Sequence, residues 1–90
     1  MTQTIIHSNL KMRWENDVNQ RYYVAMVELD LLGDWMVVRI WGRKGSSRGQ
    51  MMRRPCGDFE DGKRQVLIIH QARKKRGYHL VNQEEHLAIF

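Results

Sequence analysis

Apolar and polar side chains alternate along the first third of the chain with a period of two, the period of a half-buried β-strand. In residues 9–15 the apolar positions are Leu10, Met12 and Trp14. In residues 21–31 the alternation places five side chains inward: Tyr23, Ala25, Val27, Leu29 and Leu31. Residues 16–19 between these segments are rich in Asn and Asp, which favour turns. The pattern therefore predicts the start of an antiparallel meander.

Residues 35–41 are an aromatic and β-branched run that predicts a third strand, which Gly42 should end. The even-numbered residues Met36, Val38 and Ile40 form an apolar face that we expect to meet the main core. Trp41 shares the other face with Arg39, so we expect its indole to point away from that core.

Residues 42–49 contain three glycines, two serines and three cations, which predict a mobile basic loop. Residues 50–54 can pair as a fourth strand. Pro55 has no backbone N–H for a sheet ladder, so this strand should end there or lie at an edge.

A helix is predicted to follow. Asp58 is a suitable N-cap, acidic residues occupy the first turn, basic residues 73–76 occupy the last turn, and Gly77 can supply a left-handed cap. Residues 78–81 could return as a fifth strand, and we expect residues 82–90 to be a loosely held tail.

These elements predict an α+β fold, with an antiparallel sheet of about four to five strands and one main helix packed on one face. Ninety residues can build one hydrophobic core, so residues 1–90 are expected to be a single domain.

The charge of the chain is segregated, and the formal net charge is +5. Residues 1–34 contain three basic and five acidic residues, whereas residues 35–57 contain six basic residues and no acid. Residues 62–83 also contain six basic residues and no acid. This distribution indicates a polyanionic partner.

Several functional classes find no support in the sequence. Cys56 is the only cysteine and has no evident base beside it, the four histidines lack metal-ligand spacing, and the glycines of the basic loop do not form a nucleotide-binding pattern. No apolar run is long enough to span a bilayer, and no secretion signal is evident. We therefore expect a cytoplasmic protein that is not an enzyme, with no metal, no cofactor and no membrane partner.

The strand that ends in Trp41-Gly42-Arg43, followed by a glycine-rich basic loop, resembles the WGR domain. The resemblance runs from Met12-Arg13-Trp14-Glu15 through Arg21-Tyr22-Tyr23 to Arg76-Gly77-Tyr78. WGR domains occur in poly(ADP-ribose) polymerases and in short bacterial proteins, and their fold is an antiparallel sheet flanked by a helix.

In the polymerases the WGR domain holds DNA near a strand break. The motif tryptophan packs on the terminal nucleotide and the motif arginine contacts the backbone, so the resemblance gives these roles to Trp41 and Arg43. With the neighbouring loop, the predicted nucleic-acid-binding residues are Trp41, Gly42, Arg43, Lys44, Arg48 and Arg39. DNA ends or nicks are expected rather than a particular base sequence, because no segment is typical of a major-groove recognition helix. RNA is a second possible ligand.

Other interpretations of the same residues remain open. The chain could be an adaptor that docks an acidic protein partner through this loop, with no nucleic-acid ligand. Trp41 could instead complete a minor core with Trp35 and Val37, and the basic residues 73–76 could serve only the helix dipole.

Overall fold

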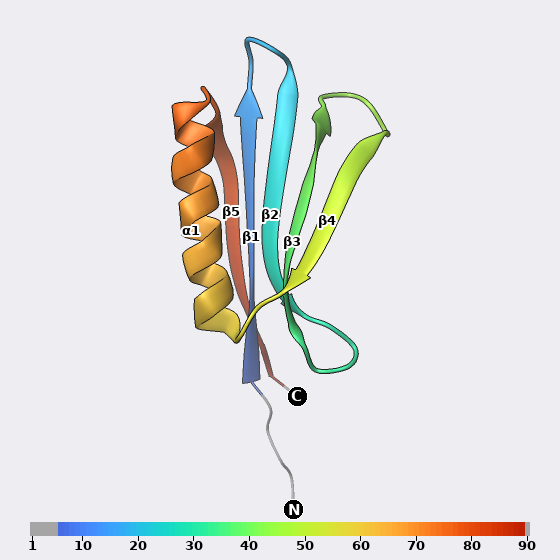
Figure 1. The fold of residues 1–90 in the computed structure, drawn as a ribbon, viewed down its shortest axis with the longest axis vertical. Helices are drawn as coiled ribbons and strands as arrows, with labels where there is room; N and C mark the ends of the chain where they lie inside the picture. Colours follow the sequence, from blue (N-terminus) through green and yellow to red (C-terminus); the bar gives the residue numbers. More distant parts are fainter. Residues whose placement is uncertain (1–5, 90) are drawn as a thin grey trace, which may run out of the picture.

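Four consecutive strands form an antiparallel meander, and a fifth strand returns to pair with the first (Figure 1). The computed structural model describes the backbone of residues 6–89 and the side chains of residues 9–85. The elements are β1 (Ile6–Asn16), β2 (Arg21–Leu29), β3 (Trp35–Arg43), β4 (Gly49–Pro55), α1 (Phe59–Lys75) and β5 (His79–Ile89). The strand order is β4-β3-β2-β1-β5, and α1 packs mainly on β1, β2 and β3. The predicted α+β fold is confirmed.

The turn between β1 and β2 is organised by Asn16, a buried polar residue whose side chain forms three hydrogen bonds. Its Oδ1 accepts hydrogen bonds from the backbone N–H groups of Val18 at 3.0 Å and Asn19 at 3.3 Å. Its Nδ2 donates to the carbonyl oxygen of Arg76 at 3.1 Å. Asn16 therefore fixes the turn and ties it to the C-terminal end of α1.

The second strand is shorter than predicted, because Asp30 starts a turn directly after Leu29. The Asp30 Oδ1 accepts the backbone N–H groups of Leu32 at 2.9 Å and Asp34 at 2.8 Å. The inward position predicted for Leu31 is wrong, since this side chain is fully exposed. Local hydrogen bonding by an Asp side chain outweighs the continued apolar alternation here.

The third strand is longer than predicted. It continues through Gly42 to Arg43, with Gly42 paired to Tyr22 on β2 and to Gly49 on β4. The expectation that Gly42 ends the strand is therefore wrong, and the connecting loop shortens to residues 44–48. The fourth strand lies at the edge of the sheet and ends at Pro55, as predicted, and all of its residues are exposed.

Helix α1 begins and ends as the sequence predicts. The N-cap Asp58 accepts the backbone N–H of Asp61 at 2.7 Å. At the other end, the N–H groups of Gly77 and Tyr78 bond to the carbonyl oxygens of Lys74 and Arg73, while Gly77 takes a φ of 85°. These bonds form a Schellman cap, which returns the chain towards the sheet.

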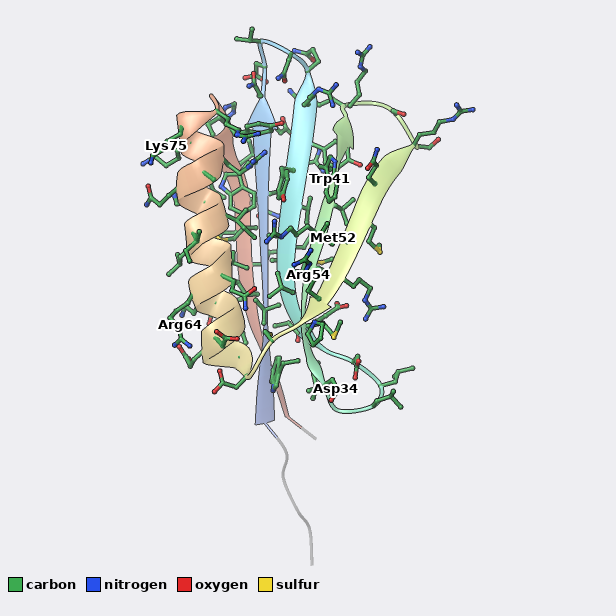
Figure 2. All side chains as sticks on the ribbon, in the orientation of Figure 1. Asp34, Trp41, Met52, Arg54, Arg64 and Lys75 are labelled. Carbon is green, nitrogen blue, oxygen red and sulfur yellow. The ribbon has the colours of Figure 1, made fainter. Side chains whose placement is uncertain are left out.

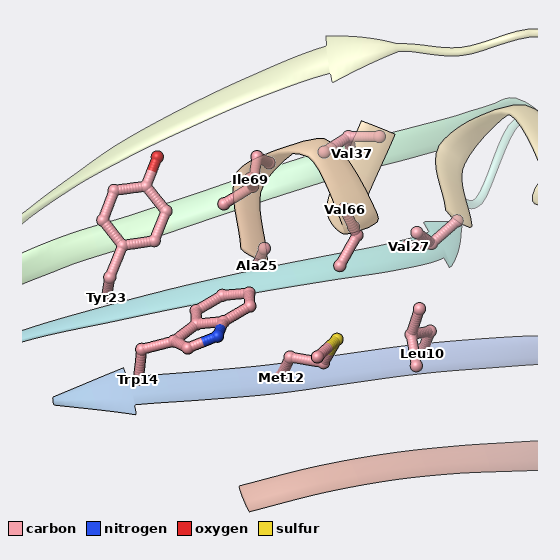
Figure 3. Packing of buried hydrophobic residues seen from close by; sticks show 9 residues of the cluster. All are labelled: Leu10, Met12, Trp14, Tyr23, Ala25, Val27, Val37, Val66 and Ile69. Atoms are coloured by element: carbon pink, nitrogen blue, oxygen red, sulfur yellow. The ribbon is translucent and has the colours of Figure 1, made fainter. Parts of the chain in front are cut away.

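The hydrophobic core lies between α1 and one face of the sheet, as Figure 3 shows. Its buried members are Leu10, Met12, Trp14, Tyr23, Ala25, Val27, Val37, Val66 and Ile69. Gly62 brings the helix closest to β2, because a Cβ atom there would lie 2.6 Å from Val27 Cγ1. The inward positions predicted for β1 are therefore confirmed, as are Tyr23, Ala25 and Val27 of β2.

The face of β3 that meets this core is the opposite of the one predicted. Helix α1 covers the odd-numbered side, where Val37 is buried and Trp35 and Trp41 pack against the core. Both faces of β3 are apolar, so its alternation alone does not indicate which one the helix covers. Val38, on the even-numbered side, is also buried, at 2% exposure.

The expectation of a loose tail after residue 81 is wrong for residues 82–89, which continue β5 and pair with β1 as far as Ile6–Ile89. The register of this pair shifts between Arg13 and Trp14, where a β-bulge interrupts it. Residue 90 lies outside the described part of the chain. The alternation in β5 is weak, because Asn, Gln and Glu fill much of the strand.

Candidate nucleic-acid interface

Three aromatic rings form a ladder across β1, β2 and β3, near the end of the sheet where β1 and β3 finish. Trp14, Tyr23 and Trp41 lie directly opposite one another on β1, β2 and β3. The rings of Trp14 and Tyr23 meet edge to face with centroids 6.1 Å apart, and the rings of Tyr23 and Trp41 stack with centroids 5.8 Å apart. Trp14 is fully buried, and its Nε1 donates to His70 Nδ1 at 2.8 Å. Burial therefore decreases along the ladder towards Trp41.

Trp41 is half-buried at the outer end of this ladder. The prediction that its indole points away from the core is wrong, because Tyr23 stacks on one side of it. On its other side β3 pairs with β4, whose residues are all exposed. The residue opposite Trp41 on β4 is Gln50. The indole is thus both a packing residue and an accessible aromatic surface.

Basic side chains surround Trp41 on the same side of the sheet. Arg39 and Arg43, like Trp41, are odd-numbered residues of β3, so all three side chains point to the same side of the strand. Arg21 lies directly opposite Arg43, Met52 lies opposite Arg39, and Arg54 lies opposite Val37. Because side chains that face each other across a ladder share one side of the sheet, these residues lie on the helix side of β2, β3 and β4. Figure 2 labels Trp41, Met52 and Arg54 among them.

Helix α1 contributes a further cation to the same place. The Arg73 guanidinium lies 4.3 Å from the centre of the Tyr23 ring and 5.1 Å from that of Tyr78. Its Nε is buried and has no hydrogen-bond partner within the described residues. Arg73 therefore holds positive charge against the ring on which Trp41 stacks.

We call Trp41 and the five arginines on its side of the sheet the basic strip, namely Arg21, Arg39, Arg43, Arg54 and Arg73. Among the side chains that the structure describes, none of these five guanidinium groups forms an ion pair with a carboxylate. The cross-strand pair Arg21–Arg43 places two like charges opposite each other, an arrangement that destabilises a sheet unless an anion joins them.

Lys44 lies elsewhere, although it follows Arg43 in the sequence. Its Nζ contacts Asp17 Oδ1 at 2.6 Å and Glu15 Oε1 at 3.2 Å. Its backbone N–H donates to the carbonyl oxygen of Gln20 at 2.8 Å. The bond to Asp17, and then that to Glu15, raises the pKa of Lys44. Lys44 thus joins the loop after β3 to the turn after β1, and its charge is already shared by two carboxylates.

Gly42 and Gly49 are needed for packing within the sheet. A Cβ atom on Gly42 would lie 3.2 Å from the Tyr22 hydroxyl, and one on Gly49 would lie 2.6 Å from it. The two glycines therefore make room for the Tyr22 phenol on the side of the sheet away from the helix. Arg48 lies in the exposed loop, where its N–H donates to Ser46 Oγ at 3.1 Å.

The structure therefore brings together only three of the six predicted site residues. Arg39, Trp41 and Arg43 come together on the basic strip, Gly42 supports the strand, Lys44 is paired with acids, and Arg48 lies in the loop. Sequence reasoning missed Arg21 and Arg54. Only the cross-strand register places them on the same side of the sheet as Trp41, with Arg21 opposite Arg43 and Arg54 opposite Val37. The spacing of aromatic residues in β1, β2 and β3 was the signal that could have indicated this register.

The structure offers little for catalytic chemistry. Burial, with Asp61 and Asp58 nearby, raises the pKa of the Cys56 thiol, which disfavours the nucleophilic thiolate. The described side chains, residues 9–85, include no group of three or more His, Cys, Asp or Glu that could bind a metal ion. In the part of the chain that the structure describes, no helix has the length and apolar character needed to cross a membrane.

Comparison with known proteins places the chain in a family. The family model of the WGR domain matches residues 8–85, and this family is generally linked to nucleic-acid binding. Over 58 residues the chain is 43% identical to the uncharacterized protein y4dW of Sinorhizobium fredii (strain NBRC 101917 / NGR234). The match covers 64% of this chain but only 28% of that protein. No solved structure matches the chain. Because the family model spans most of the sequence, the chain belongs to the WGR domain family.

Proposed function

We propose that this domain binds nucleic acid through the basic strip and that its preferred ligands are DNA ends or nicks. The observation that carries the proposal is a partly exposed indole on the same side of the sheet as five arginines that form no ion pair within the described residues. Arginine is well suited to phosphate, because its planar guanidinium donates several hydrogen bonds to phosphate oxygens. An aromatic ring beside such cations adds stacking on a sugar or base.

The covered ring face of Trp41 supports a preference for ends. Tyr23 stacks on one side of the indole, so a single face remains for a ligand. A nucleotide within an intact duplex is already stacked on both sides, whereas a terminal or nick-flanking nucleotide has one free side. One free indole face and one free nucleotide face match each other. The sequence of the DNA is not expected to matter, because the proposed contacts are a stacking ring and cations that bind the phosphate backbone, which carry no base information.

The proposal is tested by fluorescence titration with three duplexes of one sequence: nicked, blunt-ended, and closed at both ends by hairpins. We expect the nicked and blunt duplexes to bind more tightly than the closed one. About four to five phosphate contacts would give a log–log salt slope of about −4. A single-stranded RNA of the same length compares RNA with DNA.

Equal affinity for all three duplexes would contradict recognition of ends. The adaptor alternative is tested in the same assay with an acidic polypeptide such as polyglutamate. If the polypeptide binds and the nicked duplex fails to displace it, the basic strip is a protein-docking surface and the nucleic-acid proposal is wrong.

A further inference from the structure

Two leucines are exposed at the tip of the turn between β2 and β3. Leu31 is fully exposed and Leu32 is 88% exposed. Isolated apolar residues are common on protein surfaces, but two neighbouring leucines at the end of a hairpin form a contiguous apolar projection. We call Leu31 and Leu32 the leucine tip.

The leucine tip is held in place by its own turn. The Asp30 carboxylate accepts the N–H groups of Leu32 and Asp34, the Asp30 N–H donates to the Asp34 carbonyl oxygen at 2.9 Å, and Gly33 N–H donates to the Asp30 carbonyl oxygen at 3.1 Å. Gly33 adopts a φ of 85°, which glycine tolerates without strain. The turn therefore presents both leucines outward in a defined geometry, and little conformational entropy would be lost when they bind.

Carboxylates flank the leucine tip. Asp30 and Asp34 lie at its base, and Glu28 precedes it on β2. The nearby cation Arg53 lies 3.8 Å from the Glu28 carboxylate. The surface that receives this tip should therefore be apolar in its centre and basic at its rim.

The face of the sheet opposite α1 contains a hollow of that kind. Its volume is about 400 Å³. Val24, Met26 and Ile40 form its apolar floor, and Lys11 and Arg13 contribute cations at its rim. The Arg13 guanidinium also contacts Glu15 at 3.0 Å. Ser46, from the loop after β3, lines the hollow as well.

We propose that the leucine tip of one copy of this chain seats in the open-face hollow of a second copy. The chain carries both the apolar projection with acidic flanks and the apolar hollow with a basic rim. With a net charge of +5, a symmetric contact between basic faces would be repulsive, whereas the acidic tip can approach the basic rim. The contact is head to tail, so each copy keeps one unused partner surface and further copies can add.

The basic strip stays accessible in this arrangement. It lies on the helix-side face, the hollow lies on the opposite face, and the β2–β3 turn is at the other end of β3 from Arg43 (Figure 1). The proposal does not rest on nucleic-acid binding, and it can be tested without any nucleic acid.

The experiment is sedimentation equilibrium of the 90-residue chain between about 10 µM and about 1 mM, the range for a small and transient contact. We expect the average mass to rise above the monomer mass of 10.8 kDa with concentration, and to rise less at high salt. The double variant Leu31→Ser, Leu32→Ser should weaken association at least about 100-fold. The matched control is Val18→Ser, which removes an exposed apolar side chain from another turn and should leave association unchanged.

A second variant tests the hollow itself. Met26→Glu places a carboxylate on its floor and should abolish association, with circular dichroism to show that the variant is folded. A mixture of the tip variant and the Met26→Glu variant retains one intact tip and one intact hollow, and it should form a 1:1 complex and nothing larger. The proposal is overturned if the wild-type chain stays monomeric at 1 mM, if Val18→Ser acts like the tip variant, or if the mixture of folded variants stays monomeric.

Discussion

The indole ring of Trp41 stacks on the phenol ring of Tyr23, with centroids 5.8 Å apart and planes inclined by 14°. Tyr23 in turn contacts the buried ring of Trp14 and lies under the Arg73 guanidinium. The tryptophan of the Trp-Gly-Arg motif is therefore the outer end of an aromatic ladder that reaches into the core. This relationship makes Trp41 contribute to both folding and ligand binding.

Trp41→Ala should consequently affect both properties. We expect it to lower the free energy of unfolding by about 1–3 kcal/mol, less than the about 3–5 kcal/mol expected for Trp14→Ala, because Trp41 is only half-buried. It should also weaken binding to nicked DNA about 5- to 150-fold through lost stacking. Urea unfolding and fluorescence titration measure the two effects. Equal destabilisation by both alanine variants would contradict the order of burial along the ladder.

Arg53 and Arg54 form a natural matched pair, because neighbouring residues of β4 point to opposite sides of the sheet. Arg54 belongs to the basic strip, whereas Arg53 lies near Glu28 on the open face. Arg54→Ala should weaken DNA binding and reduce the salt slope by about one unit, and Arg53→Ala should change neither. Binding isotherms at four salt concentrations give both values. If Arg53→Ala has the larger effect, the ligand binds the face opposite the helix.

Arg43 and Lys44 should differ in the same assay, although both follow the motif glycine. Arg43→Met removes an exposed cation from the basic strip, whereas Lys44→Met removes one that is already paired with Asp17 and Glu15. We expect the Arg43 variant to lose several-fold more affinity than the Lys44 variant. The reverse order would mean that the ligand displaces the two carboxylates from Lys44.

Lys44→Met should instead change the response of the fold to acid. Lys44 lowers the pKa of Asp17 below its ordinary value of 3.8, and Arg13 and then Lys44 lower the pKa of Glu15 below 4.5. Stability from these carboxylates is present above those ordinary values and is lost as the pH falls through the lowered ones. Between about pH 6 and pH 3, the melting temperature of Lys44→Met should therefore fall less than that of the wild type.

A carboxyl NMR titration provides a direct check of the same cluster. In Lys44→Met the pKa of Asp17 should rise towards its ordinary value, and that of Glu15 should rise only in part, because Arg13 still bonds to it. An unchanged Asp17 pKa would show that the ion pair does not form in solution.

Gly62→Ala should destabilise the domain even though alanine favours helices by about 1 kcal/mol over glycine. The added methyl group would lie 2.6 Å from Val27 Cγ1 and 3.1 Å from Cys56 Sγ, so helix and sheet must separate, at a cost of about 1–3 kcal/mol. The cost should shrink in a Val27→Ala background. Gly57→Ala is the control, since its new Cβ would meet only ordinary contacts at 3.6 Å or more. A stabilised Gly62→Ala variant would show that the close approach of α1 to β2 is wrong.

Much of the fold could be predicted from local signals. The alternation in β1 and β2, the Asp58 cap and the Gly77 cap each act within a few residues, and the structure has all of them. The end of β2 could not be predicted from alternation, because the side chain of Asp30 forms a competing turn. The continuation of strand β5 beyond residue 81 was missed because its polar side chains leave little apolar alternation to recognise.

The candidate site was harder to predict, because it is assembled across strands. Trp41, Arg39 and Arg43 lie on one strand, and the alternation of side chains along that strand is enough to place them on the same side. Arg21 and Arg54 join them only through the register of β2 and β4 with β3. The sequence of β3 also could not indicate which of its two faces the helix covers, because both faces are apolar. The partner of Lys44 lies 27 residues away in the sequence, at Asp17.

The strand order has a consequence for how the chain folds. Strands β1 to β4 join neighbours in the sequence, so their pairing closes short loops. Strand β1 gains its second neighbour only from β5, with pairs as distant as Ile6 and Ile89. Until β5 docks, one side of β1 has no partner strand, although β1 carries the most deeply buried tryptophan. During synthesis the meander can assemble before β5 emerges, and we expect the docking of β5 to be slower, because it joins residues far apart in the sequence.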